Sequence, residues 1–364
     1  MTPLLREIRQ NPLLWLLVLV PVALGAQLLA PQAHTLLFVL SIGAIVPLAA
    51  LLSRATESVA AKTGDMIGGL LNATLGNLTE LLIALAALRA GQYVLVKASI
   101  AGAIVTNSLF MLGASFLIGG LKHHVQEFNR SNARLQGGLL FLATIAILIP
   151  SVLAEADAKA NVAVTQTLST GLSVLLIATY GLGLLFSLKT HRQLFAGRDH
   201  DQSGEAEWPL LLAVVTLAAV TVLVALVSEV FVESVQQAAT ALGLSPAFVG
   251  FIIVALVGGA AEMVSAFSAA RKNRLDLSVA IALGSSVQIA LFVAPLLVLV
   301  SYVIGPRPMD LQFWPGAVAM MMIASLTASL VTNTGRSAWF VGVLVLTVYL
   351  IFAMTLYVLP PAVR

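Results

Sequence analysis

The chain has 364 residues, of which 59% are hydrophobic and only 10% are charged, with a formal net charge of +3. A soluble domain carries about 25% charged residues, so this composition excludes a water-soluble protein of this size and indicates that lipid is its main solvent. The 19 basic residues fall mostly in short loops, which excludes a nucleic-acid-binding surface, and the absence of cysteine excludes disulfides, thiolate metal sites and cysteine nucleophiles.

Apolar segments that are long enough to cross a bilayer recur along the whole chain. A spanning helix needs about 20 mostly apolar residues. We expect eleven such helices, at 12–30, 34–52, 66–88, 94–120, 134–154, 167–188, 208–232, 246–270, 276–304, 312–331 and 337–358. The long polar connector 189–207 separates the sixth from the seventh, and we interpret it as a cytoplasmic linker between two halves. The sequence therefore predicts an all-α polytopic membrane protein.

The basic residues predict the orientation, because Lys and Arg accumulate in cytoplasmic loops. We place the N-terminus and every second loop on one side, called side A, and the other loops on side B. Side A then carries 14 of the 19 Lys and Arg residues. We expect side A to be cytoplasmic, with the N-terminus inside and the C-terminus outside. Since targeting features and eukaryotic extensions are absent, we expect a bacterial inner membrane.

An internal repeat aligns residues 68–109 with 250–291, without gaps, at an offset of 182 positions. The matches that carry weight involve residue types that are sparse here: Gly68 with Gly250, Gly76 with Gly258, Glu80 with Glu262, Arg89 with Arg271, and Gly102 with Gly284. The third and the eighth helices are five positions apart in chain order. Because five is odd, the two copies cross the membrane in opposite directions. Such inverted repeats are typical of secondary transporters that bind their substrate near the midplane.

The repeat predicts an arrangement of one plus five plus five helices. Residues 1–33 form an extra N-terminal transmembrane helix, 34–188 the first five-helix repeat and 208–364 the second. The linker 189–207 joins the two repeats.

Two glutamates, Glu80 and Glu262, lie inside apolar runs at equivalent positions of the repeat. An ionisable group at mid-membrane costs at least about 2.5 kcal/mol and marks a functional site by default, so we favour this over a pair of protonated structural glutamates. Two facing carboxylates suit Ca²⁺, which takes about 6–8 oxygen ligands. Gly76 and Gly258 allow the backbone to bend and expose carbonyl oxygens to a cavity. Without metal the carboxylates repel each other, so the same groups can take up protons, and competition between the two ions gives exchange.

Polar residues near the glutamates are candidates for a supporting role or a proton path. Asn77 precedes Glu80, and the following helices carry Asn107 in the first repeat and Ser285, Ser286 and Gln288 in the second. Their amides and hydroxyls can ligate a cation or orient the carboxylates, and interhelical hydrogen bonding is the alternative. No nucleotide-binding signature is present. We therefore expect no enzyme activity, no cofactor and no nucleotide, and transport driven by an ion gradient.

Four stretches resemble the two signature repeats of the Ca²⁺/H⁺ exchanger branch of the cation/Ca²⁺ exchanger superfamily: Gly69–Glu80, Lys97–Ser99, Asp276–Pro295 and Pro308–Phe313. The resemblance implies the eleven-helix fold and exchange of Ca²⁺ for protons. It maps the cation-binding glutamates onto Glu80 and Glu262, the carbonyl ligands onto Gly76 and Gly258, and the polar residues onto Asn107, Ser285, Ser286 and Gln288.

The second repeat departs from the family pattern at two positions, since Gly259 and Met263 stand where the family usually has Asn and His. This leaves the ion selectivity open, and exchange coupled to Na⁺ or K⁺ is the alternative to Ca²⁺/H⁺ antiport. An ion channel is a third reading, against which the inverted repeat argues because it is typical of alternating access. Stoichiometry, oligomeric state and the role of the linker stay open.

Overall fold

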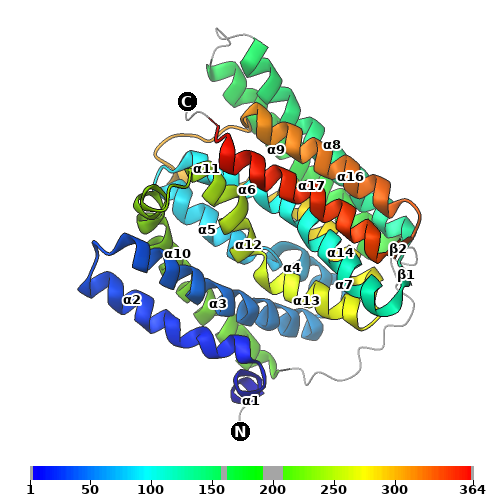
Figure 1. The fold of residues 1–364 in the computed structure, drawn as a ribbon, viewed down its shortest axis with the longest axis horizontal. Helices are drawn as coiled ribbons and strands as arrows, with labels where there is room; N and C mark the ends of the chain where they lie inside the picture. The colour runs from blue at the N-terminus through cyan, green and yellow to red at the C-terminus, as the bar shows by residue number, and fades with distance from the viewer. Residues whose placement is uncertain (1–2, 157–161, 192–207, 362–364) are drawn as a thin grey trace.

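The computed structural model describes residues 3–156, 162–191 and 208–361 (Figure 1). Within these ranges nine helices are long and apolar enough to cross a membrane, and there are eleven spans when each of two bent helix pairs is counted as one. Each span corresponds to one of the eleven predicted segments, so the prediction of a polytopic helical membrane protein is confirmed. The linker 189–207 lies outside the described residues, apart from its first three positions.

The first half of the chain contains the first six spans. Its elements are α1 (Pro3–Gln10), η1 (Pro12–Val18), α2 (Leu19–Leu29), α3 (His34–Lys62), α4 (Asp65–Leu75), α5 (Leu78–Arg89), α6 (Tyr93–Val105), η2 (Thr106–Met111), α7 (Leu112–His123), β1 (Val125–Glu127), α8 (Arg130–Ala156), α9 (Val162–Leu185) and η3 (Phe186–Thr190). Here η1 is a 3₁₀ helix, whereas η2 and η3 are π-helical turns.

The second half contains the other five spans. Its elements are α10 (Leu210–Ala241), α11 (Pro246–Phe248), η5 (Val249–Val254), α12 (Ala255–Gly258), α13 (Ala260–Arg271), α14 (Leu275–Gln288), η6 (Ile289–Val293), α15 (Ala294–Ile304), α16 (Pro315–Thr332), β2 (Arg336–Ala338) and α17 (Trp339–Val358). Both η5 and η6 are π-helical turns.

Two helices are longer than the sequence predicts. The segment 34–52 becomes α3, which continues to Lys62, and the segment 208–232 becomes α10, which continues to Ala241. Apolar residues mark the part of a helix that lies in the hydrocarbon, whereas a helix goes on into the interface as long as its residues favour helical structure. Apolar residues therefore predict which part of a helix crosses the membrane, but not where the helix ends.

A short β-ladder joins two loops on side A. β1 pairs antiparallel with β2, and Val125 lies opposite Ala338. These six residues depart from the all-α prediction, because three-residue strands carry too little periodic pattern to be recognised. The ladder ties the loop after α7 to the loop before α17, which agrees with the prediction that both loops lie on one side.

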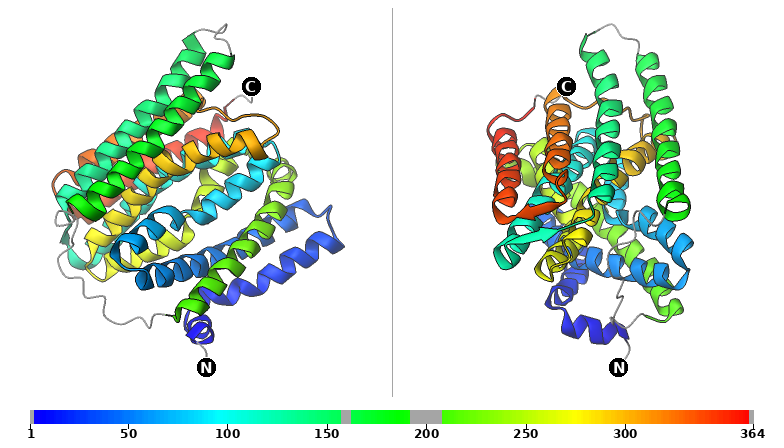
Figure 2. Two further views of the ribbon diagram at one scale, coloured as in Figure 1. Left: turned by 180° about the vertical axis from the view of Figure 1, so that it is seen from behind. Right: turned by 90° about the vertical axis from the view of Figure 1, so that its right-hand side faces the viewer.

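The first helices of the two repeats, α3 and α10, pack against each other at one edge of the molecule, and α2 packs outside α3 (Figure 1). At the opposite edge α8 packs against α16, and α8 and α9 extend beyond the other helices at one end (Figure 2). The span Tyr93–His123 runs through the centre, with 89% of its most apolar stretch buried. The centre of the fold is therefore built from the helices that carry the polar candidate residues.

Both spans that carry a glutamate are broken just before it. Ile67–Leu75 and Leu78–Arg89 meet at an angle of 43°, and Pro246–Gly258 and Ala260–Arg271 meet at 58°. The breaks fall at Gly76 and Asn77 in one span and at Gly259 in the other. A bend was expected at Gly76 and Gly258; the first span bends at Gly76 and Asn77, and the second bends one residue later than expected, at Gly259.

Candidate cation-binding site

Each glutamate lies in the first turn of a half-helix. Glu80 is the third residue of α5, and Glu262 is the third residue of α13. The free N–H groups at a helix N-terminus favour a carboxylate, while the last carbonyls of the preceding half-helix lack helical donors. Gly76 caps α4 and Gly258 ends α12. Carboxylate and carbonyl oxygens are thus brought to the same two helix breaks.

The two glycines allow side chains of the opposite half to come close. A Cβ atom added at Gly258 would lie 2.9 Å from Cγ of Glu80. A Cβ atom at Gly76 would lie 3.4 Å from Oε1 of Gln288. Each helix break is therefore covered by a polar side chain from the other repeat.

Ser285 links the two halves by hydrogen bonds. Nδ2 of Asn107 donates to Oγ of Ser285 over 2.9 Å, and Oγ of Ser285 donates to Oδ1 of Asn77 over 2.7 Å. All three side chains are buried. Three of the predicted site residues are thereby joined across the two repeats, and Asn77 is the N-cap of the half-helix that carries Glu80.

Ser286 lies apart from this network. Its hydroxyl donates to the backbone carbonyls of Ala282 and Ile104, at 2.9 and 3.3 Å. Ile104 is the repeat equivalent of Ser286 itself, so the contact marks the crossing of the two equivalent helices. Its hydroxyl is occupied by helix packing.

Several buried polar atoms near the breaks have no hydrogen-bond partner among the described residues. The acceptors are Oε1 of Glu80, Oε2 of Glu262 and Oδ1 of Asn107, and the donors are Nδ2 of Asn77 and Nε2 of Gln288. Leaving such atoms buried and unpaired costs about 1–3 kcal/mol each, and more for a charged group. Three free oxygen acceptors suit a hard cation, because carboxylate and amide oxygens are ligands that Ca²⁺ prefers.

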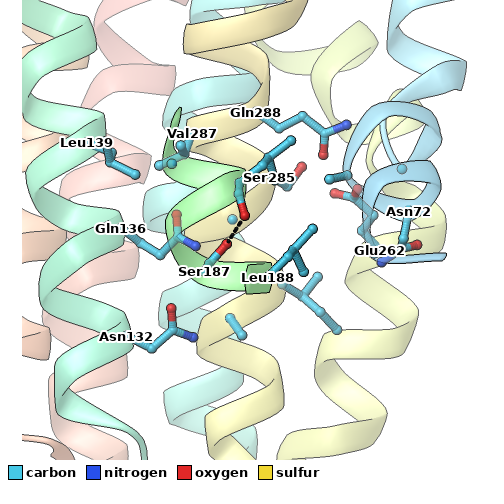
Figure 3. A pocket seen from close by; sticks show the side chains of 18 of the residues that line it. Asn72, Asn132, Gln136, Leu139, Ser187, Leu188, Glu262, Ser285, Val287 and Gln288 are labelled. Atoms are coloured by element: carbon cyan, nitrogen blue, oxygen red, sulfur yellow. Dashed lines mark hydrogen bonds between the residues drawn. The ribbon is translucent and has the colours of Figure 1, made fainter. Parts of the chain in front are cut away.

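A cavity of about 540 Å³ opens from side A to Glu262. Figure 3 shows Ser285 and Gln288 pointing from α14 toward the region of Glu262 and Asn72, with Asn132 and Gln136 of α8 on the opposite wall. Glu57, Asn132 and Ser187 line its outer part near the side A loops. Glu262 is therefore reached from this side.

The equivalent cavity next to Glu80 is almost closed, at about 10 Å³. Five of its lining residues are repeat equivalents of residues that line the large cavity: Glu80 of Glu262, Ser99 of Ile281, Ala103 of Ser285, Val254 of Asn72, and Ala255 of Ala73. The two cavities are thus the same place in the two repeats, one open and the other collapsed.

Close helix packing seals the Glu80 side. A Cβ atom at Gly102 of α6 would overlap the backbone of Phe251 in η5, whereas a Cβ atom at the equivalent Gly284 would meet nothing within 4 Å. Nζ of Lys97 also pairs with Oδ1 of Asp310 at 2.5 Å, joining α6 to the loop before α16 on side B. The structure is open to side A and closed to side B.

The sequence pattern does not mark Tyr180 or the cavity residues Asn132 and Gln136. All three lie outside the aligned segments of the repeat. A single Tyr, Asn or Gln in an apolar helix carries no pattern of its own, so only the fold shows that these residues face the site.

Comparisons with known proteins agree over nearly the whole chain. The family model described as sodium/calcium exchanger protein matches residues 33–189 and again 212–358. A Ca²⁺/H⁺ antiporter of Aphanothece halophytica is 37% identical over 95% of this chain and 96% of its own, and the Ca²⁺/H⁺ antiporter ChaA of Bacillus subtilis is 42% identical over 86% and 90%.

Solved structures show the same likeness. Native YfkE superposes with a TM-score of 0.83 at 37% identity, covering 96% of this chain and all of that one. The H⁺/Ca²⁺ exchanger CAX reaches a TM-score of 0.75 at 18% identity, over 96% and 88% of the two chains, and so shares the fold.

Proposed function

The chain belongs to the sodium/calcium exchanger protein family, in its Ca²⁺/H⁺ antiporter branch, and we propose that it exchanges Ca²⁺ for protons by alternating access, with Glu80 and Glu262 as the shared site. It is a transporter and not an enzyme. What supports this site is that both carboxylates, equivalent in the two inverted halves, have a buried oxygen without a hydrogen-bond partner among the described residues. One borders the open cavity and the other the closed one.

Ca²⁺ enters from the cavity and binds between the two half-helix breaks in this proposal. Glu80 and Glu262 supply charge, and the carbonyls of Gly76 and Gly258 supply neutral oxygens. Water from the cavity completes the 6–8 oxygen ligands that Ca²⁺ takes. The free Oδ1 of Asn107 is a further candidate ligand, and its bond to Ser285 fixes its orientation. Asn77 and Gln288 support the carboxylates from their own helices.

Protons compete with Ca²⁺ for the same carboxylates. Two charges close together in a low-dielectric interior repel strongly once the cation has gone, and proton uptake removes that repulsion. The site is then neutral when it carries either Ca²⁺ or protons. The protein can switch between its two states when the site is occupied, but not when the site is empty and doubly charged. This couples the two ion fluxes.

The placement in the membrane follows the same proposal. Side A, to which the cavity opens, is the cytoplasmic side of a bacterial inner membrane. Residues 34–188 and 208–364 are the two repeats that exchange conformations, and residues 1–33 are the extra helix outside them.

The test is Ca²⁺ uptake into proteoliposomes under an imposed pH gradient. Uptake driven by the pH gradient and unaffected by Na⁺ or K⁺ gradients is the expected result. Uptake that follows a Na⁺ or K⁺ gradient and ignores pH contradicts it. The Na⁺ and K⁺ gradients are included because Gly259 and Met263 depart from the family pattern. A Cβ atom at Gly259 would lie 3.3 Å from the free Oδ1 of Asn107, so the Asn that the family usually has there would occupy that space.

A further inference from the structure

Tyr180 of α9 holds the end of the bent half-helix α4. Its hydroxyl donates to the carbonyl of Ala73 over 2.7 Å, and its side chain is buried in the wall of the open cavity. In an unbroken helix this carbonyl would accept from the N–H of Asn77. The break before Glu80 leaves the carbonyl without that donor. Tyr180 therefore replaces a helical hydrogen bond in the half-helix that lines the open cavity.

The equivalent half-helix, which lines the closed cavity, keeps the helical bond instead. Ala255 is the repeat equivalent of Ala73, and its carbonyl accepts from the N–H of Gly259 over 3.1 Å. The closed half-helix also contains the π-helical turn η5 (Val249–Val254), whereas the equivalent residues 67–72 are α-helical. The two half-helices thus differ in backbone hydrogen bonding as well as in position.

Tyr349 of α17 is the counterpart of Tyr180. Each tyrosine comes from the last helix of its repeat, and each ring packs on a phenylalanine of the other repeat. Tyr180 packs on Phe292 with ring centres 5.7 Å apart, and Tyr349 packs on Phe110 at 5.3 Å. Phe110 and Phe292 are equivalent residues, 182 positions apart. The two rings therefore occupy equivalent places in the two halves.

The two hydroxyls have different partners. That of Tyr349 accepts from Oγ1 of Thr106 over 3.3 Å, and no acceptor for its own proton is recorded among the described residues. The repeat equivalent of Thr106 is Gln288, which lines the open cavity with Tyr180 and whose Nε2 has no partner there. Nε2 of Gln288 is thus available to donate to the hydroxyl of Tyr180 in the other state.

We propose that Tyr180 and Tyr349 are positioning residues that hold the two half-helices alternately, each bonding the carbonyl of Ala73 or Ala255 on the side that is open. In the state open to side B, Tyr349 donates to Ala255, the N–H of Asn77 returns to Ala73, and Tyr180 accepts from Gln288. The exchange keeps the carbonyls of Ala73 and Ala255 paired in both states. This inference rests on the alternating-access part of the proposed function and goes beyond it in naming the residues that stabilise each state.

The absence of cysteine from the sequence gives a direct test by single-cysteine labelling. Ser265→Cys reports the cavity open to side A, and Ser99→Cys reports the collapsed cavity next to Glu80. Each reporter is combined with Tyr180→Phe or Tyr349→Phe and labelled in detergent with a hydrophilic thiol reagent. Tyr357→Phe is the matched control, because Tyr357 lies on α17 and is exposed.

The two variants are expected to act in opposite directions. Tyr180→Phe removes the bond to Ala73, so labelling at position 265 slows and labelling at position 99 speeds up. Tyr349→Phe slows labelling at position 99. Each change is about fivefold, the shift that one average hydrogen bond gives in an equilibrium. The control leaves both rates unchanged.

Shifts in the same direction for both variants, or no shift in either, overturn the proposal. Phe keeps the ring packing in both variants, and if one does not purify as a folded protein, the other must still move the reporters in its own direction. Labelling needs neither Ca²⁺ nor an ion gradient. Its outcome is therefore independent of which ions are exchanged. Failure of the transport assay and failure of the labelling test can thus be told apart.

Discussion

Glu80 lies directly against Gly258, so that a Cβ atom at position 258 would come within 2.9 Å of Cγ of the glutamate. One half of the molecule thus provides the carboxylate and the other half provides the space that the carboxylate needs. The proposed site thus lies where the two repeats meet, and a methyl group at position 258 is expected to disturb it.

Gly258→Ala is therefore expected to displace Glu80 and to weaken Ca²⁺ transport. Overpacking of this kind costs about 1–3 kcal/mol, which corresponds to about a 5- to 150-fold rise in the KM for Ca²⁺. Ca²⁺ uptake in proteoliposomes measures it. Gly138→Ala on α8 is the control, since a Cβ atom there meets nothing within 4 Å. Equal transport by both variants would contradict the assignment of Gly258.

Glu80→Gln and Glu262→Gln are each expected to abolish exchange while the protein still folds. Removing one charge of a desolvated ionic site costs about 3–5 kcal/mol, or a loss of about a hundredfold and more. The measurement is pH-driven Ca²⁺ uptake at equal amounts of reconstituted protein. Glu229→Gln serves as control, because Glu229 is exposed and pairs with Arg89 outside the site. A Gln variant with normal uptake would remove that residue from the site.

Gly284→Ala is expected to leave Ca²⁺ binding intact and to block turnover. The alanine fits the present state, in which nothing lies within 4 Å of a Cβ atom at this position. Its equivalent Gly102 packs on the backbone of Phe251 in the closed half, so α14 must make the same close approach when side A closes. We expect near-normal Ca²⁺ affinity in detergent with exchange reduced about tenfold or more. Exchange at the normal rate would show that α14 does not close in this way.

The affinity for Ca²⁺ is expected to fall as the pH falls, because protons occupy the same oxygens. Where Ca²⁺ displaces two protons, the Kd changes by about a hundredfold per pH unit, and by about tenfold where it displaces one. Calorimetric titration over a series of pH values measures the slope. In Glu80→Gln the slope should drop to that of one proton. An affinity that does not depend on pH would argue against a shared site.

The sequence predicted the architecture and the helix breaks well, because both depend on features that leave local traces. Lipid exposure leaves long apolar runs, and a charge or a glycine in such a run stands out. The offset between Glu80 and Glu262 also indicated the inverted repeat, and the two separate family matches in 33–189 and 212–358 agree with it.

The asymmetry of the site was beyond the sequence. Equivalent residues such as Ala73 and Ala255 are identical in type, yet one accepts from a tyrosine and the other from a backbone N–H. The sequence repeat makes the two halves look alike, whereas the structure shows one conformation, in which the two halves differ. Ser286 shows the same limit at a single residue, since its polarity marked it as a site candidate and the fold uses it at a helix crossing.

The collapsed cavity next to Glu80 has a consequence for energy conservation. Its volume of about 10 Å³ is close to the least that one water molecule requires, so no file of waters can pass Glu80 toward side B in this state. Proton leakage along this route is thereby prevented in this state. In the proposed mechanism the gradient is therefore used only when the helices move and this cavity opens.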